Sequence, residues 1–180
     1  MAISITYFVH GTTTDNEKGL ATGWLPGELS DLGKEQAKEL GNLVSDKMFD
    51  VVICSDLKRA IDSAQLAFGE KNKIIQDKRL RECNYGDWNG QKHDFKDDMK
   101  KYIVSPFPNG ESYKQVESRL HNFINYLKHD YEDKKVAVVA HQAPQLALEV
   151  LLNSQTWEQA IDNDWRKKGE WQPGWEYIIK

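Results

Sequence analysis

The chain has 180 residues, of which 39% are hydrophobic and 29% charged, and its formal net charge is −4 at pH 7. This length is typical of one globular domain, so we expect a single domain spanning residues 1–180. The apolar runs are far too short for a membrane-spanning helix. Nucleic-acid-binding proteins concentrate Lys and Arg on one face, whereas the positive charges here alternate with Asp and Glu. We therefore expect neither a nucleic acid nor a membrane as a partner.

The N-terminus and the cysteines indicate a cellular compartment. The first residues have no basic start and no long apolar stretch, so we interpret them as a first strand rather than as a signal peptide. Without an export signal, Cys54 and Cys83 are expected to be reduced and buried. These features predict a cytoplasmic protein. The oligomeric state stays open, with a homo-oligomer among the alternatives.

Strands and helices alternate through the first half of the chain. A β-rich run over Ile3–Val9 is followed by a polar loop, Thr12–Asn16. Ser30 is a typical N-cap for a helix that continues to about Lys47, with apolar residues at helical spacing. The next three predicted elements are a strand, a helix capped by Ser55 and Asp56, and a short strand: Phe49–Cys54, residues 55–67 and Lys73–Gln76.

The second half begins with a loop-rich stretch and then returns to regular elements. The predicted elements are a polar helix, a long amphipathic helix, a buried strand, two further helices and a last strand: Phe95–Tyr102, Ser112–Asp130, Val136–Ala140, Ala143–Leu152, Thr156–Asp164 and Trp175–Ile179. Strands that alternate with helices predict an α/β fold with a mainly parallel central sheet.

Polar side chains follow three of the predicted strands directly. His10-Gly11 follows the first strand, Ser55-Asp56 the second, and His141-Gln142 the strand at Val136–Ala140. In open α/β sheets, ligands bind outside the carboxyl ends of the strands. The sequence therefore predicts that these three segments line one crevice.

The residue types in this crevice suit phosphoryl transfer. An imidazole nitrogen can accept a phosphoryl group and pass it to water, and a second imidazole can hydrogen-bond the phosphoryl oxygens. Arg59, on the first turn of a predicted helix, offers a rigid fork of N–H donors that matches phosphate oxygens. The histidines show no metal-ligand spacing, and no glycine-rich phosphate loop is present. We expect no metal ion and no other cofactor.

Several motifs in this chain resemble those of the histidine phosphatase superfamily, the fold family of cofactor-dependent phosphoglycerate mutase. The family's Arg-His-Gly-x-Thr-x-x-Asn motif corresponds to residues 9–16, which match it at every position except the first. Three further segments are similar and follow in family order: Ser-Asp-Leu-Lys-Arg-Ala at 55–60, Leu-Arg-Glu-Cys-Asn-Tyr-Gly-Asp-Trp-Asn-Gly at 80–90, and the strand and histidine at 136–141. The resemblance implies a three-layer α/β/α fold, phosphoglycerate mutase-like.

The resemblance also implies roles for individual residues. His10 would attack phosphorus and form a phosphohistidine, while Arg59 and His141 would bind the non-bridging oxygens. Glu82 would protonate the leaving oxygen and then activate water. The remaining phosphate-binding candidates are Asn16, Thr13, Gly11 and Gln142. For Asn16 and Thr13, bracing of the loop is an equal alternative.

Position 9 departs from the family motif. Val9 stands where the motif has Arg, so a guanidinium is missing from the expected phosphate site. The loss of one such donor typically costs two to three orders of magnitude in rate. Lys18 or His93 are candidates to compensate for it.

Three functions remain after these arguments. The first is a metal-independent phosphatase, a phosphoric monoester hydrolase acting on a small phosphorylated metabolite. The second is a phosphoglycerate mutase-type phosphotransferase, which needs the same residues and a site that excludes water. The third is a protein of low or no activity that binds a phosphorylated ligand, as Val9 would allow. The sequence does not specify the substrate.

Overall fold

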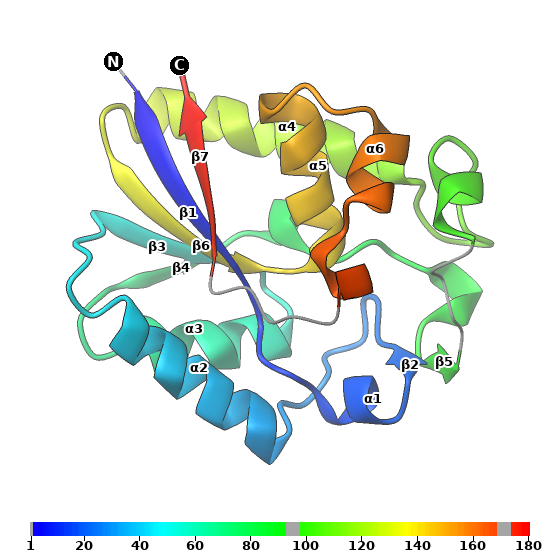
Figure 1. Ribbon diagram of the computed structural model, residues 1–180, viewed down its shortest axis with the longest axis horizontal. Helices are drawn as coiled ribbons and strands as arrows, with labels where there is room; N and C mark the ends of the chain where they lie inside the picture. Colours follow the sequence, from blue (N-terminus) through cyan, green and yellow to red (C-terminus); the bar gives the residue numbers. More distant parts are fainter. Residues whose placement is uncertain (1, 93–97, 169–173) are drawn as a thin grey trace.

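A five-stranded sheet forms the centre of the computed structural model, which describes residues 2–92, 98–168 and 174–180 (Figure 1). The strands lie in the order β4-β3-β6-β1-β7. Neighbours are parallel except β7, which is antiparallel to β1. Their bounds are Ile3–Val9 (β1), Val51–Cys54 (β3), Ile74–Gln76 (β4), Lys135–Ala140 (β6) and Trp175–Ile179 (β7). The predicted α/β fold with a mainly parallel sheet is confirmed.

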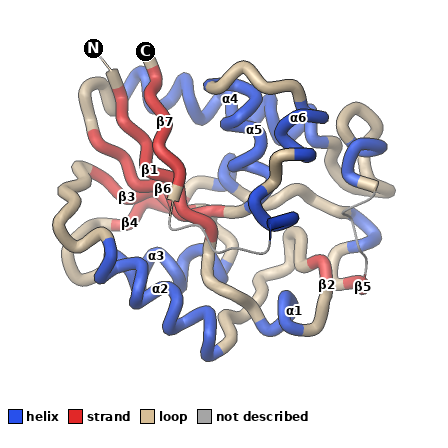
Figure 2. Tube along the Cα trace, in the orientation of Figure 1, coloured by secondary structure: helices blue, strands red, loops and turns tan. Residues whose placement is uncertain are grey.

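Helices cover both faces of this sheet (Figures 1 and 2). One face packs against α4 (Tyr113–Asp130) and α5 (Gln142–Leu152), and α6 (Trp157–Asp162) packs against α5 in the same hydrophobic cluster. The other face packs against α2 (Asp31–Leu43) and α3 (Lys58–Phe68). The remaining regular elements are small: α1 (Thr14–Glu17) and a two-stranded sheet of β2 (Leu20–Ala21) and β5 (Gln91–Lys92).

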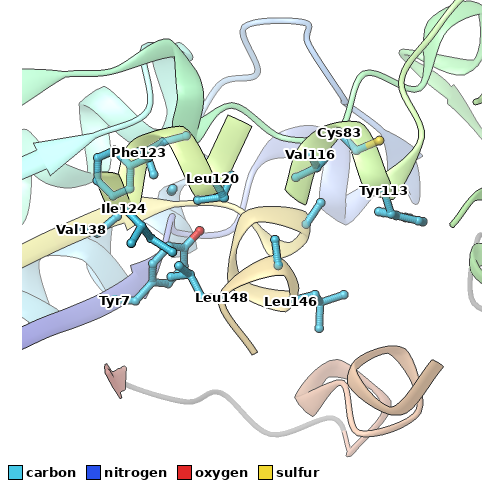
Figure 3. Packing of buried hydrophobic residues seen from close by; sticks show 14 of the residues in the cluster. Tyr7, Cys83, Tyr113, Val116, Leu120, Phe123, Ile124, Val138, Leu146 and Leu148 are labelled. Atoms are coloured by element: carbon cyan, nitrogen blue, oxygen red, sulfur yellow. The ribbon is translucent and has the colours of Figure 1, made fainter. Parts of the chain in front are cut away.

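The strand sequences explain why both faces are covered. Successive side chains of a strand point to opposite faces. On β6, Val136 and Val138 therefore belong to the cluster under α4 and α5, whereas Ala137 and Val139 face α2 and α3. Figure 3 shows Val138 and Tyr7 of the sheet packed among side chains of α4 and α5. Burial on both faces requires the continuous apolar runs seen in the sequence.

The long helix α4 follows directly from its local sequence. Ser112 caps it in a reciprocal capping box with Gln115. Its buried positions recur every three or four residues and place one stripe on the sheet: Val116, Leu120, Phe123, Ile124 and Leu127.

Two predicted helix boundaries are wrong. Helix α2 ends at Leu43 rather than near Lys47, because Val44, Ser45 and Asp46 are weak helix formers that favour non-helical conformations. Helix α3 begins at Lys58 and has no side-chain cap. Of the two residues expected to cap it, Asp56 bonds to Arg81, whereas Ser55 accepts from the Leu57 N–H just before the helix and contacts His141.

Two further predictions concern loops. The segment Thr12–Asn16, predicted to be a loop, contains the short helix α1, which Thr13 caps. The predicted helix Phe95–Tyr102 lies partly outside the described residues; its final part, Met99–Tyr102, is a 3₁₀ helix.

Both cysteines are free and buried, as predicted. Cys54 faces α2 and α3, whereas Cys83 belongs to the cluster on the opposite face of the sheet. Among the helices of the described segments, none combines the length and the apolar character needed to cross a membrane.

Candidate active site

Three parallel strands end side by side and bring the predicted site residues together. The backbone N–H of His10 donates to the carbonyl of Ala140 at 3.0 Å, and the N–H of Ser55 donates to that of Val139 at 3.0 Å. The pairing of β1, β3 and β6 therefore continues just past the strand ends. His10, Ser55 and His141 consequently meet at the carboxyl edge of the sheet, as the sequence predicts.

His10 is held in one tautomer. Its Nδ1 lies 2.7 Å from the carbonyl oxygen of Gly11, which can only accept, so Nδ1 carries the proton. Its Nε2 then presents a lone pair, which accepts a hydrogen bond from Arg59 Nε at 3.2 Å. Burial, and next the charge of Arg59, lower the pKa of His10 to about 3. The ring is therefore a neutral nitrogen nucleophile at physiological pH.

Arg59 is almost completely buried, and a surrounding loop fixes its guanidinium. Nη1 donates to the carbonyls of Leu25 and Pro26 at 2.7 and 3.2 Å, and Nη2 donates to that of Gly23 at 2.8 Å. These bonds orient Nε toward His10. Burial lowers the pKa of Arg59, and the charge of Glu82 acts in the opposite direction. Glu82 is therefore close enough to sense the same guanidinium.

His141 faces His10 across the site, with 5.0 Å between the ring centroids. Its Nε2 lies 2.8 Å from the hydroxyl oxygen of Ser55. The Tyr7 hydroxyl holds the backbone on both sides, because it donates to the His141 carbonyl at 2.6 Å and accepts from its N–H at 3.0 Å. Burial, followed by the charge of Arg59, holds the pKa of His141 well below its ordinary value.

The hydrogen bonds of Ser55 favour one tautomer of His141. Ser55 Oγ accepts a bond from the Leu57 N–H at 3.2 Å, so its own proton is available for His141 Nε2. When Ser55 donates this proton to Nε2, the neutral ring carries its own proton on Nδ1. This buried atom has no hydrogen-bond partner within the described part of the chain. In this tautomer, His141 Nδ1–H is a donor that none of the described residues engages.

Glu82 reaches the site from a loop, and backbone amides hold its carboxylate. Oε1 accepts from the N–H groups of Cys83 and Ala143 at 2.8 and 3.0 Å, and Oε2 accepts from that of Gln142 at 3.2 Å. The carboxylate therefore sits on the N-terminal turn of α5, beside His141. Two side chains fix its main chain, since Trp24 Nε1 and Arg119 Nη2 both donate to the Glu82 carbonyl.

The four secondary candidates occupy different positions. Thr13 and Asn16 form a reciprocal capping box, each side chain bonded to the other's backbone N–H. This is the bracing role that was one of their two expected alternatives. Gly11 uses its carbonyl for His10 and its N–H for the hydroxyl of Ser63, at 3.0 Å. Gln142 gives its N–H to Glu82.

Val9 lies partly buried at the end of β1, opposite Ala140. Of the two candidates to compensate for it, Lys18 is exposed at the end of α1, and His93 lies outside the described residues. The charge of a third cation, Arg166, lowers the pKa of both His10 and His141, after the larger effects of burial and of Arg59. Nothing in the sequence marked this residue, which follows the last predicted helix in a polar stretch. Across the described segments, no group of His, Cys, Asp and Glu side chains is arranged to hold a metal ion.

Comparisons with known proteins agree with this geometry. The chain is 32% identical to the adenosylcobalamin/alpha-ribazole phosphatase of Escherichia coli, over 74% of this chain and 70% of that protein. It is also 32% identical to the 2,3-bisphosphoglycerate-dependent phosphoglycerate mutase of Rhizobium meliloti, over 84% of this chain and 80% of that one.

A solved structure and a family model extend the comparison. The mycobacterial glucosyl-3-phosphoglycerate phosphatase superposes with a TM-score of 0.78 at 26% identity, covering 90% of this chain and 84% of that chain. The model of the histidine phosphatase superfamily (branch 1) matches residues 7–168. The relatives named above are phosphatases and a phosphoglycerate mutase. A match over this much of the chain establishes the family: the protein belongs to the histidine phosphatase superfamily.

Proposed function

We propose that this protein is a phosphatase that hydrolyses a small phosphomonoester through a phosphohistidine on His10. The observation that carries the proposal is the tautomer of His10. Its Nδ1–H is engaged by the Gly11 carbonyl at 2.7 Å, which leaves the Nε2 lone pair facing Arg59 in a site that keeps the ring neutral. A neutral imidazole whose free nitrogen faces a phosphate-binding cation is suited to attack phosphorus.

In the first step, His10 Nε2 forms a bond to phosphorus while the bond from phosphorus to the ester oxygen breaks. The Arg59 Nε–H, which points at Nε2 in the free protein, and the His141 Nδ1–H donate to the non-bridging oxygens. Fixed donors of this kind stabilise the charge that spreads over those oxygens in the transition state. Glu82 in its acid form gives its proton to the departing oxygen, which leaves as an alcohol.

In the second step, water replaces the alcohol. The Glu82 carboxylate takes a proton from water as the water oxygen attacks phosphorus, and the bond from phosphorus to Nε2 breaks. Inorganic phosphate leaves, His10 returns to its neutral state, and Glu82 is protonated for the next cycle. All stabilising charges in this scheme come from side chains of this chain.

A turnover assay with a trapping experiment tests the proposal. The protein is assayed against a panel of phosphomonoesters in the presence of a metal chelator, beside His10→Ala. We expect turnover that His10→Ala abolishes, and an acid-labile phosphoryl label on His10 after rapid quenching. Turnover or label that survives in His10→Ala would overturn the assignment of the nucleophile. A native protein that binds orthovanadate without turning over any substrate would instead support the phosphate-binding alternative.

The mutase relative supports a second candidate, a phosphoglycerate mutase-type phosphotransferase. A mutase uses the same first step but passes the phosphoryl group from His10 to a second hydroxyl of the sugar acid. The two functions separate in one assay, in which 3-phosphoglycerate is supplied with a trace of 2,3-bisphosphoglycerate. Formation of 2-phosphoglycerate identifies a mutase, whereas release of inorganic phosphate identifies a phosphatase.

A further inference from the structure

Arg166 differs from every other arginine of the chain. The sequence contains five arginines, and four of them use their guanidinium groups in hydrogen bonds to carbonyls or carboxylates: Arg59, Arg79, Arg81 and Arg119. The Arg166 guanidinium makes no hydrogen bond and no ion pair within the segments that the structure describes. Its guanidinium carbon lies 5.9 Å from the centroid of the Trp165 ring. No described residue therefore engages its donors, which leaves them available to a ligand there.

A short chain of hydrogen bonds ties Arg166 to the catalytic edge of the sheet. Its backbone N–H donates to one carboxylate oxygen of Asp164 at 3.1 Å. The other oxygen accepts from the side-chain amide of Gln142, the residue that follows His141. Asp164 is only 4% exposed, so this anchor is part of the packed structure. The segment that carries Arg166 is thereby fixed beside His141 and Glu82.

The charge of Arg166 acts on the site itself. It lowers the pKa of His10 and of His141, after the larger effects of burial and of Arg59. The same charge also lowers the pKa of Tyr7, the residue that clamps the backbone of His141. A free guanidinium whose charge reaches both catalytic rings is placed to attract an anion that binds between them.

Arg59 alone offers few donors to such an anion. A guanidinium has five N–H groups, and three of those of Arg59 are engaged by the carbonyls of Gly23, Leu25 and Pro26. Only the Nε–H and one N–H of Nη2 remain for phosphate. The N–H groups of Gln142 and Ala143 are occupied by Glu82. A dianionic phosphoryl group with three non-bridging oxygens therefore needs further positive donors.

We propose that Arg166 is the second phosphate-binding cation of this site, and that its guanidinium binds a non-bridging oxygen of the phosphoryl group transferred to His10. The inference rests on the proposed function for its chemical role. It assigns to the C-terminal segment a charge that the N-terminal motif, with Val9, does not supply. The preferred ligand of this pair of arginines is a dianionic phosphomonoester.

Substitutions of Arg166 test this role, with 4-nitrophenyl phosphate as the substrate. We expect Arg166→Ala to lower kcat/KM by about tenfold to a hundredfold, the usual cost of one transition-state donor at a partly exposed site. Arg166→Lys should retain an intermediate rate because it keeps the charge but not the fork. Guanidinium ion added at millimolar concentration should partly restore Arg166→Ala, which loss of a structural contact would not allow.

Lys167→Ala is the matched control. Lys167 lies in the same turn, but its side chain is directed to Asp162, 3.7 Å away, so its removal should leave kcat/KM unchanged. Equal losses of kcat/KM in Arg166→Ala and Lys167→Ala would mean that only the overall positive charge of this segment matters, and would overturn the proposal.

Binding of orthovanadate, measured by calorimetry, separates this proposal from the proposed function. If Arg166→Ala keeps both native kcat/KM and native orthovanadate affinity while His10→Ala is inactive, the role of Arg166 is wrong and the phosphatase stands. If no phosphomonoester is turned over by the native protein, the phosphatase is wrong. Weaker orthovanadate binding by Arg166→Ala would then still support the cation site, and unchanged binding would overturn it.

Discussion

The hydroxyl of Ser55 connects a backbone turn to the ring of His141. It accepts from the Leu57 N–H and lies 2.8 Å from His141 Nε2, so it favours the tautomer with the proton on Nδ1. We expect Ser55→Ala to lower kcat by about tenfold, because a ring free to change tautomer loses a fixed donor to phosphate. Nitrogen NMR shifts of the His141 ring would report the loss of a single tautomer.

Ser112→Ala is a suitable control for this substitution. Ser112 is also a buried serine, but it caps α4 rather than contacting a catalytic ring. Its loss should cost about 1 kcal/mol of stability and leave kcat unchanged. A Ser55→Ala protein with native kcat and an unchanged ring spectrum would contradict the tautomer argument.

Glu82 is the second residue whose role can be separated by kinetics. Glu82→Gln removes the proton donor, so we expect alkyl phosphates, which have poor leaving groups, to slow by about a hundredfold or more. Aryl phosphates such as 4-nitrophenyl phosphate need little protonation and should slow much less in the first step. Equal losses on both substrates, measured by single-turnover kinetics, would show that Glu82 only holds the start of α5.

At the scale of single residues, the sequence predicts which catalytic residues lie at strand ends, but not which side chains they contact. His10, Arg59 and His141 could be recognised because each directly follows a strand or begins a helix beside one. The contact between Ser55 and His141 joins residues 86 positions apart, and no local pattern encodes it. Arg166 carries even less signal, because a lone arginine in a polar stretch resembles a solvated surface residue.

At the scale of elements, helix α2 positions the catalytic loop through a glycine. A Cβ atom on Gly33 would lie 1.9 Å from the carbonyl oxygen of Thr12, so the helix and the loop after His10 are in direct backbone contact. Gly33→Ala must displace this loop. We expect a loss of about 1–3 kcal/mol in stability and of about tenfold in kcat/KM.

Gly41→Ala, on the same helix, separates the two effects. A Cβ on Gly41 would lie 2.6 Å from the carbonyl of Ala67 in α3, away from the site. Its cost in the free energy of unfolding should be similar, while kcat/KM should stay native. Parallel losses of activity in both variants, measured beside urea unfolding, would mean that α2 acts only through overall stability.

The elements differ in how well their sequences predict them. Strands β1, β6 and β7 are rich in β-branched, aromatic or other apolar residues, and their predicted positions are confirmed or differ by one residue. The two-residue strands β2 and β5 are too short to show any periodicity. Their pairing depends on the distant loops that carry them, so only the structure reveals them.

At the scale of the whole molecule, the half-buried His10 and the buried His141 couple stability to pH. The folded state keeps His10 neutral down to about pH 3, and the pKa of His141 is also lowered, whereas both protonate near pH 6.5 when unfolded. Below pH 6.5 the unfolded chain therefore binds more protons, and stability falls as the pH falls. The slope approaches about 1.4 kcal/mol per pH unit for each histidine.

Urea unfolding between pH 7 and pH 5 measures this slope. The window lies above the range in which carboxylates with lowered pKa, such as Asp56 beside Arg81, begin to protonate. His10→Asn should remove about half of the loss. A stability that is independent of pH across this window would show that the folded protein protonates these rings as readily as the unfolded chain does.

The directions of the strands show how far the topology of the whole sheet can be predicted from the sequence. Alternating strands and helices predict a parallel α/β sheet, because each crossover helix returns the chain in the same direction. Strand β7 breaks the pattern: α5 and α6 separate it from β6, yet it pairs antiparallel with β1, Tyr7 opposite Trp175. Its direction depends on this pairing across the full length of the chain.

That closing pair of strands brings the two ends of the sequence to one site, and a double substitution tests the consequence. Val9 ends β1, where the family motif is expected to have Arg, while Arg166 approaches from the C-terminal segment. If both positions can supply the same charge, Val9→Arg should raise kcat/KM by about tenfold in Arg166→Ala and change it little in the parent. That difference corresponds to a coupling energy of about 1.4 kcal/mol. Because Val9 is partly buried, thermal melting must confirm that each variant is folded. An equal gain in both backgrounds would mean that the two positions act independently.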